Sequence, residues 1–228
     1  MKRSTFAVVL GFLVLAFALP LGAGEIRLDG DFIQGGLVRG WASPGAAITL
    51  DGRKLRLSPE GLFIFGFGRD AARVAVLVVS YPGSEQETRN LSIAAREYRI
   101  QRIDGLPKKM VTPPPELLVR IREEGAKVRK ARAFDTAELD LFVPFAWPAQ
   151  GPISGVYGSQ RILNGEPRQP HFGVDIAAST GTPVRTPAGG EIRLAEPDLY
   201  YSGGTVILDH GYGLSSSFLH MSRVDVAV

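Results

Sequence analysis

His171 and Asp175 are separated by three residues in the segment His171-Phe172-Gly173-Val174-Asp175. On an extended segment, side chains four residues apart project from the same face, so these two could share one divalent metal ion. Gly173 between them leaves room for a close approach. Zn²⁺ accepts imidazole nitrogen and carboxylate oxygen at about 2.0–2.2 Å, and a catalytic zinc site adds a third protein ligand and an open position for water. The pair could therefore be two ligands of such a site, but this spacing often arises by chance, and the surrounding sequence is what favours the interpretation.

The sequence around this pair, from Gly155 to Ser222, resembles the lysostaphin-type (LytM-type) zinc endopeptidases, which cut peptidoglycan peptides. In that family the histidine and aspartate of H-x-G-x-D bind zinc, which implies that His171 and Asp175 are metal ligands and that the cofactor is Zn²⁺. A later T-x-Y-x-H-L-S pattern supplies a histidine that lies at the catalytic water without binding zinc. Here that pattern reads Ser-Ser-Phe-Leu-His-Met-Ser, so the resemblance implies a catalytic role for His220.

One motif of the family is missing from this sequence. The final H-x-H, which provides the third zinc ligand and a second catalytic histidine, does not occur, and the remaining histidine, His210, is expected to serve a turn beside Gly211. We expect a C-terminally incomplete enzyme, because the sequence ends in a strand-like run, Val224–Val228. Little or no hydrolysis is expected from the 228 residues themselves. In the coding DNA, an in-frame continuation with H-x-H would support the enzyme, whereas a stop codon would support an inert relative.

The first residues have the pattern of a secretory signal peptide, predicted to span residues 1–24. Lys2 and Arg3 precede an apolar run from Phe6 to Leu19, which Pro20 and small residues follow. That run is shorter than the ~20 residues that cross a bilayer. We expect a periplasmic or secreted protein with no stable membrane span after leader cleavage. The chain contains no cysteine, which excludes a cysteine-linked lipid anchor, disulfides and thiol catalysis.

The charge is nearly balanced once the leader is removed. The formal charge of +3 falls to about +1, with 24 basic and 23 acidic residues after residue 24. Residues 96–132 hold eleven of the basic and five of the acidic residues. This segment could attract an anionic envelope surface, or it could be a solvated helix face. Aromatic residues are not interleaved with the charges, so nucleic acid is a poor candidate partner.

Residues 25–95 have the pattern of a small β-sandwich. Short apolar runs alternate with turn signals at roughly ten-residue spacing, and the segment resembles bacterial immunoglobulin-like modules. Asp51-Gly52 is a candidate type I′ turn between two strands. Residues 96–140 are predicted to form a basic helical connector, with a helix from Glu116 to about Arg132 that Thr112 and three prolines precede. Its rough apolar stripe could pack on either domain or occlude the metal cleft, and we favour packing.

Residues 141–228 are expected to form an antiparallel β-sheet peptidase domain, which is truncated. An aromatic cluster at its start, Phe142, Phe145 and Trp147, is predicted to close a core. The predicted fold is thus mainly β: an N-terminal β-sandwich, a helical connector and a C-terminal sheet.

The leading functional hypothesis is an exported zinc metalloendopeptidase that hydrolyses peptide bonds of peptidoglycan cross-links. The alternative is a non-catalytic envelope factor that binds cell wall or activates an amidase. A metal-free carbohydrate-binding module is a third class, which zinc titration would separate from the other two. Peptidoglycan peptides are the expected partner in the first case, and other envelope proteins join them in the second.

Overall fold

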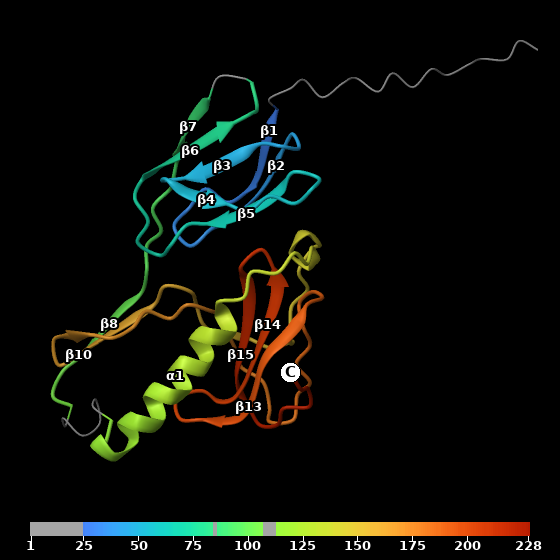
Figure 1. Cartoon of the computed structure of the whole chain (residues 1–228). Helices are drawn as coiled ribbons and strands as arrows, with labels where there is room; N and C mark the ends of the chain where they lie inside the picture. The colour runs from blue at the N-terminus through green and yellow to red at the C-terminus, as the bar shows by residue number, and fades with distance from the viewer. Residues whose placement is uncertain (1–24, 84–85, 107–112) are drawn as a thin grey trace, which may run out of the picture.

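The computed structural model describes residues 25–83, 86–106 and 113–228. Within these residues the chain is mainly β, with a single α-helix, which confirms the predicted fold class. Figure 1 shows the strands of the N-terminal part on one side and the C-terminal sheet with its helix on the other. The predicted signal peptide and Thr112 lie outside the described residues.

Seven N-terminal strands form two sheets around one apolar core, as the sequence predicts for a β-sandwich. The sheets have the orders β1-β2-β5 and β4-β3-β6-β7. The strand bounds are β1 (Ile26–Gly30), β2 (Leu37–Ala42), β3 (Ala47–Leu50), β4 (Arg53–Leu55), β5 (Leu62–Gly66), β6 (Val74–Ser80) and β7 (Glu87–Ser92).

Burial alternates along β2 and β6, the period of strands that turn one face inward. Phe63 and Leu77 are fully buried in this core. Gly40 packs directly against the Phe63 ring, where a β-carbon would overlap it.

The turn between β3 and β4 has the predicted geometry. Leu50 pairs with Arg53 across the two-residue loop. Asp51 and Gly52 both have positive φ, 48° and 78°, as a type I′ turn requires. The Asp-Gly dipeptide therefore sets the register of this hairpin.

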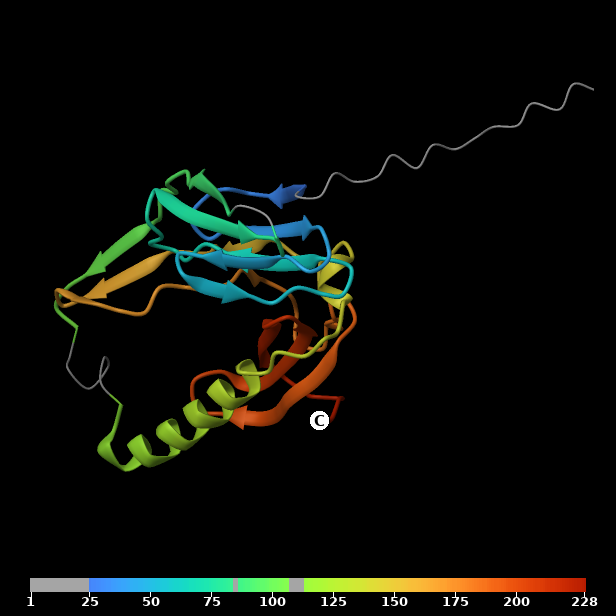
Figure 2. The same ribbon diagram turned by 45° about the horizontal axis from the view of Figure 1, so that its top comes forward.

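The segment between the sandwich and the helix contributes a strand that the helical prediction missed. β8 (Ile100–Ile103) pairs in parallel with β10 (Gln160–Leu163), which pairs antiparallel with β11 (Glu166–Pro167). Figures 1 and 2 both place β8 and β10 side by side, away from the C-terminal sheet. Backbone hydrogen bonds thus join the predicted connector to the predicted peptidase region. The domain boundaries expected at residues 95 and 140 stay predictions.

The predicted helix is present. A 3₁₀ turn, η2 (Pro115–Leu117), leads into α1 (Leu118–Arg132), which packs on the C-terminal sheet. Val128 and the buried Ala131 supply its apolar contacts, whereas Leu118 is 43% exposed. Polar contacts complete the attachment, since the Lys127 ammonium lies 2.7 Å from the Glu196 carboxylate.

Glu124 is the helix residue that most directly joins α1 to the sheet. Its carboxylate accepts hydrogen bonds from the Arg120 guanidinium and from the Tyr200 backbone N–H, the latter at 2.7 Å. Burial acts to raise the pKa of Glu124, but these hydrogen bonds, with the nearby charges of Arg120 and Lys127, hold it below its usual value. The carboxylate is therefore stabilised in its charged form.

The C-terminal sheet consists of β13 (Glu191–Leu199), β14 (Gly203–Gly211) and β15 (Leu214–Met221), all antiparallel. β14 is the central strand and is buried along almost its whole length. Before this sheet come η3 (Asp140–Phe142) and a two-stranded ladder of β9 (Ile153–Gly155) and β12 (Asp175–Ile176).

One sequence prediction about this region is wrong, and another holds only in part. The run Val224–Val228 is not a strand, because no neighbouring strand pairs with it, and Val228 is 83% exposed. The aromatic cluster closes a core only in part. Phe142 packs edge-on against Tyr212, but Trp147 is 64% exposed.

Candidate metal site

The side chains of His171 and Asp175 meet, as the sequence predicts. The Nε2 atom of His171 lies 3.1 Å from Oδ1 of Asp175. Two donors bound to one tetrahedral zinc ion at about 2.0–2.1 Å each are about 3.3–3.4 Å apart, so the observed separation fits a shared ion. Both side chains are partly exposed, at 33% and 58%, which leaves the pair open to solvent and to a ligand.

The other imidazole nitrogen of His171 has its own acceptor. Nδ1 lies 3.2 Å from the carbonyl oxygen of Val156. When Nδ1–H donates to that carbonyl, the lone pair of Nε2 points at the Asp175 carboxylate, and a cation between the two relieves their repulsion. Metal-ligating histidines characteristically anchor their second nitrogen in this way.

The local backbone differs from the extended segment assumed above. Residues 171–174 are irregular, and only Asp175–Ile176 form a short strand, in which Asp175 pairs with Gly155 of β9. The backbone N–H of His171 donates to Ser159 O at 2.8 Å, and its carbonyl accepts from Gly158 N–H at 2.7 Å. The histidine is thus oriented by the loop after β9 rather than by strand periodicity.

Gly155, not Gly173, is the glycine that the site requires. A β-carbon at Gly155 would overlap the Asp175 carboxylate. A β-carbon at Gly173 would have His171 Nε2 as its nearest neighbour, at 3.8 Å. Sequence reasoning missed Gly155, since the partner strand of Asp175 cannot be identified from spacing alone.

His220 lies on β15 and is exposed. Its backbone N–H donates to Ser202 O at 2.8 Å, and its φ is +60°, a conformation that is uncommon outside glycine. Such strained residues gather at functional sites. No hydrogen bond or ion pair among the described residues joins His220 to His171 or Asp175, so its catalytic role stays a prediction.

His210 is structural, in accord with its exclusion from the site. It is fully buried, and its two ring nitrogens contact Gly189 O at 2.5 Å and Ser216 Oγ at 2.7 Å. The Phe145 ring packs on it with a centroid distance of 4.8 Å. Both polar atoms of the imidazole are therefore occupied inside the protein.

The residue before it, Asp209, is a buried carboxylate that sequence reasoning did not find. Its oxygens accept hydrogen bonds from Thr136 Oγ1 at 2.8 Å and from Gly211 N–H at 2.9 Å, and Arg193 lies 3.6 Å away. These partners come from three separate segments, so no local pattern predicts them. The network joins β13, β14 and the stretch after α1.

No cluster of three or more histidine, cysteine, aspartate or glutamate side chains within residues 25–83, 86–106 and 113–228 is placed to hold a metal ion. His171 and Asp175 offer one nitrogen and one oxygen donor at 3.1 Å, and their role as zinc ligands stays a prediction. In the same part of the chain, no helix is long and apolar enough to cross a membrane.

Comparison with known proteins identifies the region that contains this pair. The sequence profile of Peptidase family M23 matches residues 169–228. We call this matched region the M23 segment. The M23 segment includes β13–β15 and all three histidines of the chain.

Two curated bacterial proteins are similar to the chain. The Cell division protein DipM of Caulobacter vibrioides is 30% identical over 116 residues, which are 51% of this chain and 18% of DipM. The Lipoprotein NlpD/LppB homolog of Pseudomonas aeruginosa is 34% identical over 80 residues, which are 35% of this chain and 25% of that protein. The chain therefore spans a quarter or less of the length of these relatives.

A crystal structure of a Pseudomonas aeruginosa protein described as a candidate M23 peptidase shares the fold. The TM-score is 0.60 at 23% sequence identity, and the similarity covers 86% of this chain and 76% of the other. The shared arrangement thus extends well beyond the M23 segment, into the N-terminal strands.

Proposed function

We propose that the M23 segment is the zinc-binding part of an exported metalloendopeptidase that hydrolyses peptide bonds in peptidoglycan cross-links. The observation that carries the proposal is the approach of His171 Nε2 to Asp175 Oδ1 at 3.1 Å, with the Val156 carbonyl at Nδ1. A nitrogen and an oxygen donor that converge while the second nitrogen is anchored form the arrangement expected of zinc ligands.

In this proposal each residue has a defined task. Bound zinc supplies a Lewis acid for the scissile carbonyl and lowers the pKa of its water to about 7. His171 contributes a neutral nitrogen and Asp175 a negative charge. His220 acts near the attacking water, where it orients the water, accepts its proton or, as imidazolium, stabilises the developing oxyanion.

In this proposal His171 and Asp175 are two of the three protein ligands that a catalytic zinc site uses. Zinc binding should therefore be weak and hydrolysis slow. A second candidate function is a non-catalytic envelope factor that binds cell wall or activates an amidase, since no group of three metal-binding side chains occurs within residues 25–83, 86–106 and 113–228. Both functions place the protein in the periplasm or outside the cell, as the predicted leader requires. The two relatives are named as a cell division protein and a lipoprotein, and these names accord with an envelope role.

Zinc titration of the purified chain tests the site itself. We expect one zinc ion per chain, with binding lost in both His171→Ala and Asp175→Asn. His220→Gln is the matched control, because it removes a histidine of the same segment that is not a ligand in this proposal. Zinc binding that survives His171→Ala would refute the assignment.

Digestion of purified peptidoglycan separates the two functions. Free imidazole in solution can supply the missing nitrogen donor, so the enzyme hypothesis predicts zinc-dependent release of peptide fragments that increases when imidazole is added. The increase should be absent from Asp175→Asn. Sedimentation of the chain with peptidoglycan, without fragment release at any imidazole concentration, would support the non-catalytic factor instead.

A further inference from the structure

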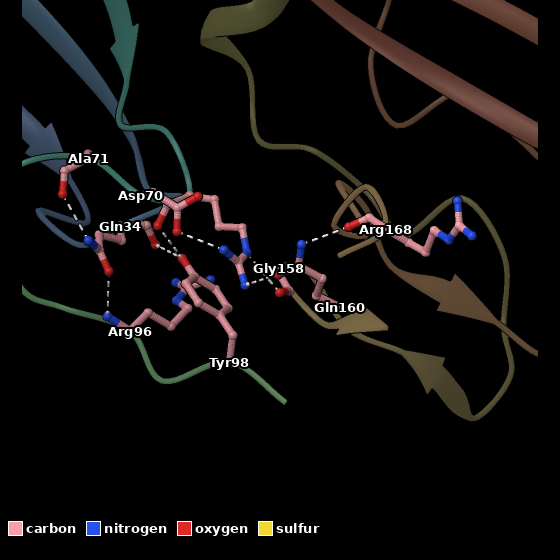
Figure 3. Close-up of polar contacts among 9 residues, drawn as sticks. Gln34, Asp70, Ala71, Arg96, Tyr98, Gly158, Gln160 and Arg168 are labelled. Carbon is pink, nitrogen blue, oxygen red and sulfur yellow. Dashed lines mark hydrogen bonds and ion pairs between the residues drawn. The ribbon is translucent and has the colours of Figure 1, made fainter. Parts of the chain in front are cut away.

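The N-terminal sandwich contacts the loop that orients His171. Arg69 lies after β5, and its side chain is only 11% exposed. Its Nε–H donates to the carbonyl oxygen of Gly158 at 2.9 Å, and a terminal nitrogen lies 3.4 Å from Oε1 of Gln160. Figure 3 shows Asp70, Tyr98, Gly158 and Gln160 at this group of polar contacts.

Two neighbours hold the Arg69 side chain, and one of them also binds its backbone. Its guanidinium stacks over the Tyr98 ring at 4.4 Å and contacts the Asp70 carboxylate at 2.7 Å. The Tyr98 hydroxyl donates to the Arg69 carbonyl at 3.0 Å. A guanidinium that is ordered in advance loses little entropy when it binds the loop, which makes it an effective positioning group.

From Gly158 the contacts continue to His171 without a gap. The Gly158 N–H, on the same residue whose carbonyl Arg69 binds, donates to His171 O at 2.7 Å. The next carbonyl, that of Ser159, accepts the His171 N–H at 2.8 Å, and Val156 O accepts from the imidazole. Arg69 therefore binds a residue that itself contacts His171, next to Ser159 and two residues after Val156.

The fit of this loop against the sandwich depends on glycine. Gly158 has φ +82°, and a β-carbon there would overlap the Tyr98 ring. On the sandwich side, a β-carbon at Gly35 would overlap the ring of Tyr157. Gln160 completes the contact, because its amide nitrogen donates to Arg168 O at 2.7 Å, three residues before His171.

We propose that Arg69 is a positioning residue for the metal ligand His171, through which the N-terminal sandwich fixes the geometry of the zinc site. The inference rests on the proposed zinc-binding role of His171. It assigns to the sandwich a task within the site, in addition to any binding role of its own.

Arg69→Ala tests the proposal, with Arg73→Ala as the control, since Arg73 is an exposed arginine of the same loop. Zinc affinity should fall by roughly 3- to 10-fold in Arg69→Ala, less than the 10- to 100-fold typical when a direct partner of a ligating histidine is lost. Amide hydrogen exchange at Gly158 and His171 should accelerate, while exchange in β14 stays unchanged.

Two further variants exclude a general loss of stability. Arg69→Lys keeps one donor for Gly158 O and should restore part of the affinity. Gly158→Ala displaces the loop from the other side and should reproduce the Arg69→Ala phenotype in a protein whose sandwich is intact. Unchanged zinc affinity together with unchanged exchange at Gly158 and His171 in Arg69→Ala would overturn the proposal. If the unaltered chain binds no zinc, the proposed function fails, and the exchange measurement still decides whether Arg69 positions His171.

Discussion

Gly155→Ala should weaken zinc binding while leaving the protein folded. The added β-carbon would overlap the Asp175 carboxylate, so the carboxylate must rotate away from His171. The displaced atoms are at the end of a side chain that is 58% exposed, so the rotation costs at most about 0.5–1.5 kcal/mol in rotamer strain. Moving one of two ligands out of place should lower zinc affinity at least as much as loss of a hydrogen-bond partner of a ligating histidine does, roughly 10- to 100-fold, or about 1.4–2.7 kcal/mol.

Gly173→Ala is the matched control for this experiment. It adds the same methyl group to the same site, but the nearest atom is 3.8 Å from the new carbon, an ordinary contact distance. Calorimetric zinc titration and thermal unfolding of both variants make the comparison. The reasoning would be refuted if Gly155→Ala bound zinc as tightly as the unaltered chain, or if Gly173→Ala lost binding to the same degree.

Three further predictions concern the elements that support the site. His210→Ala removes a fully buried imidazole with its contacts to the Gly189 carbonyl and the Ser216 hydroxyl, and should cost about 2–4 kcal/mol in denaturant unfolding without affecting zinc binding by the folded protein. Phe63→Ala removes a fully buried ring and should cost about 3–5 kcal/mol of the stability of the sandwich, measured in the same way. The pKa of Glu124 is depressed below 4.5 in the folded state, so its stabilising effect is present above that value and is lost as the pH falls through the lower folded pKa. The stability difference between the unaltered protein and Glu124→Gln should therefore disappear in acid, and a difference that persists there would contradict the hydrogen-bonding explanation.

The features that the sequence predicted correctly are those that local chemistry determines. Asp51-Gly52 specifies its turn because only a few residues accept two positive φ values in succession. The pattern of buried alternate residues specifies the sandwich, and three prolines followed by good helix formers specify the start of α1. The convergence of His171 and Asp175 was also predicted, although the reason given, an extended segment, was wrong.

The features that were missed depend on pairing between distant segments. β8 is a strand because β10, some sixty residues later, provides its ladder. Gly155 matters only because β9 pairs with β12, and Arg69 only because Gly158 lies against it. The run Val224–Val228 has strand-forming residues but no partner strand, and β-propensity without a partner does not make a strand.

The parallel ladder between β8 and β10 alters what the segment between them can do. A tether between two domains ordinarily sets how far they can separate and how freely they turn. Here the stretch from residue 103 to residue 160 begins and ends at the same ladder, so it is a closed loop rather than a tether. A longer or shorter α1 would then change the size of that loop. The angle between the sandwich and the metal-binding segment would stay the same. Variation in helix length among related proteins should accordingly be tolerated, whereas a one-residue shift in the β8–β10 register should not.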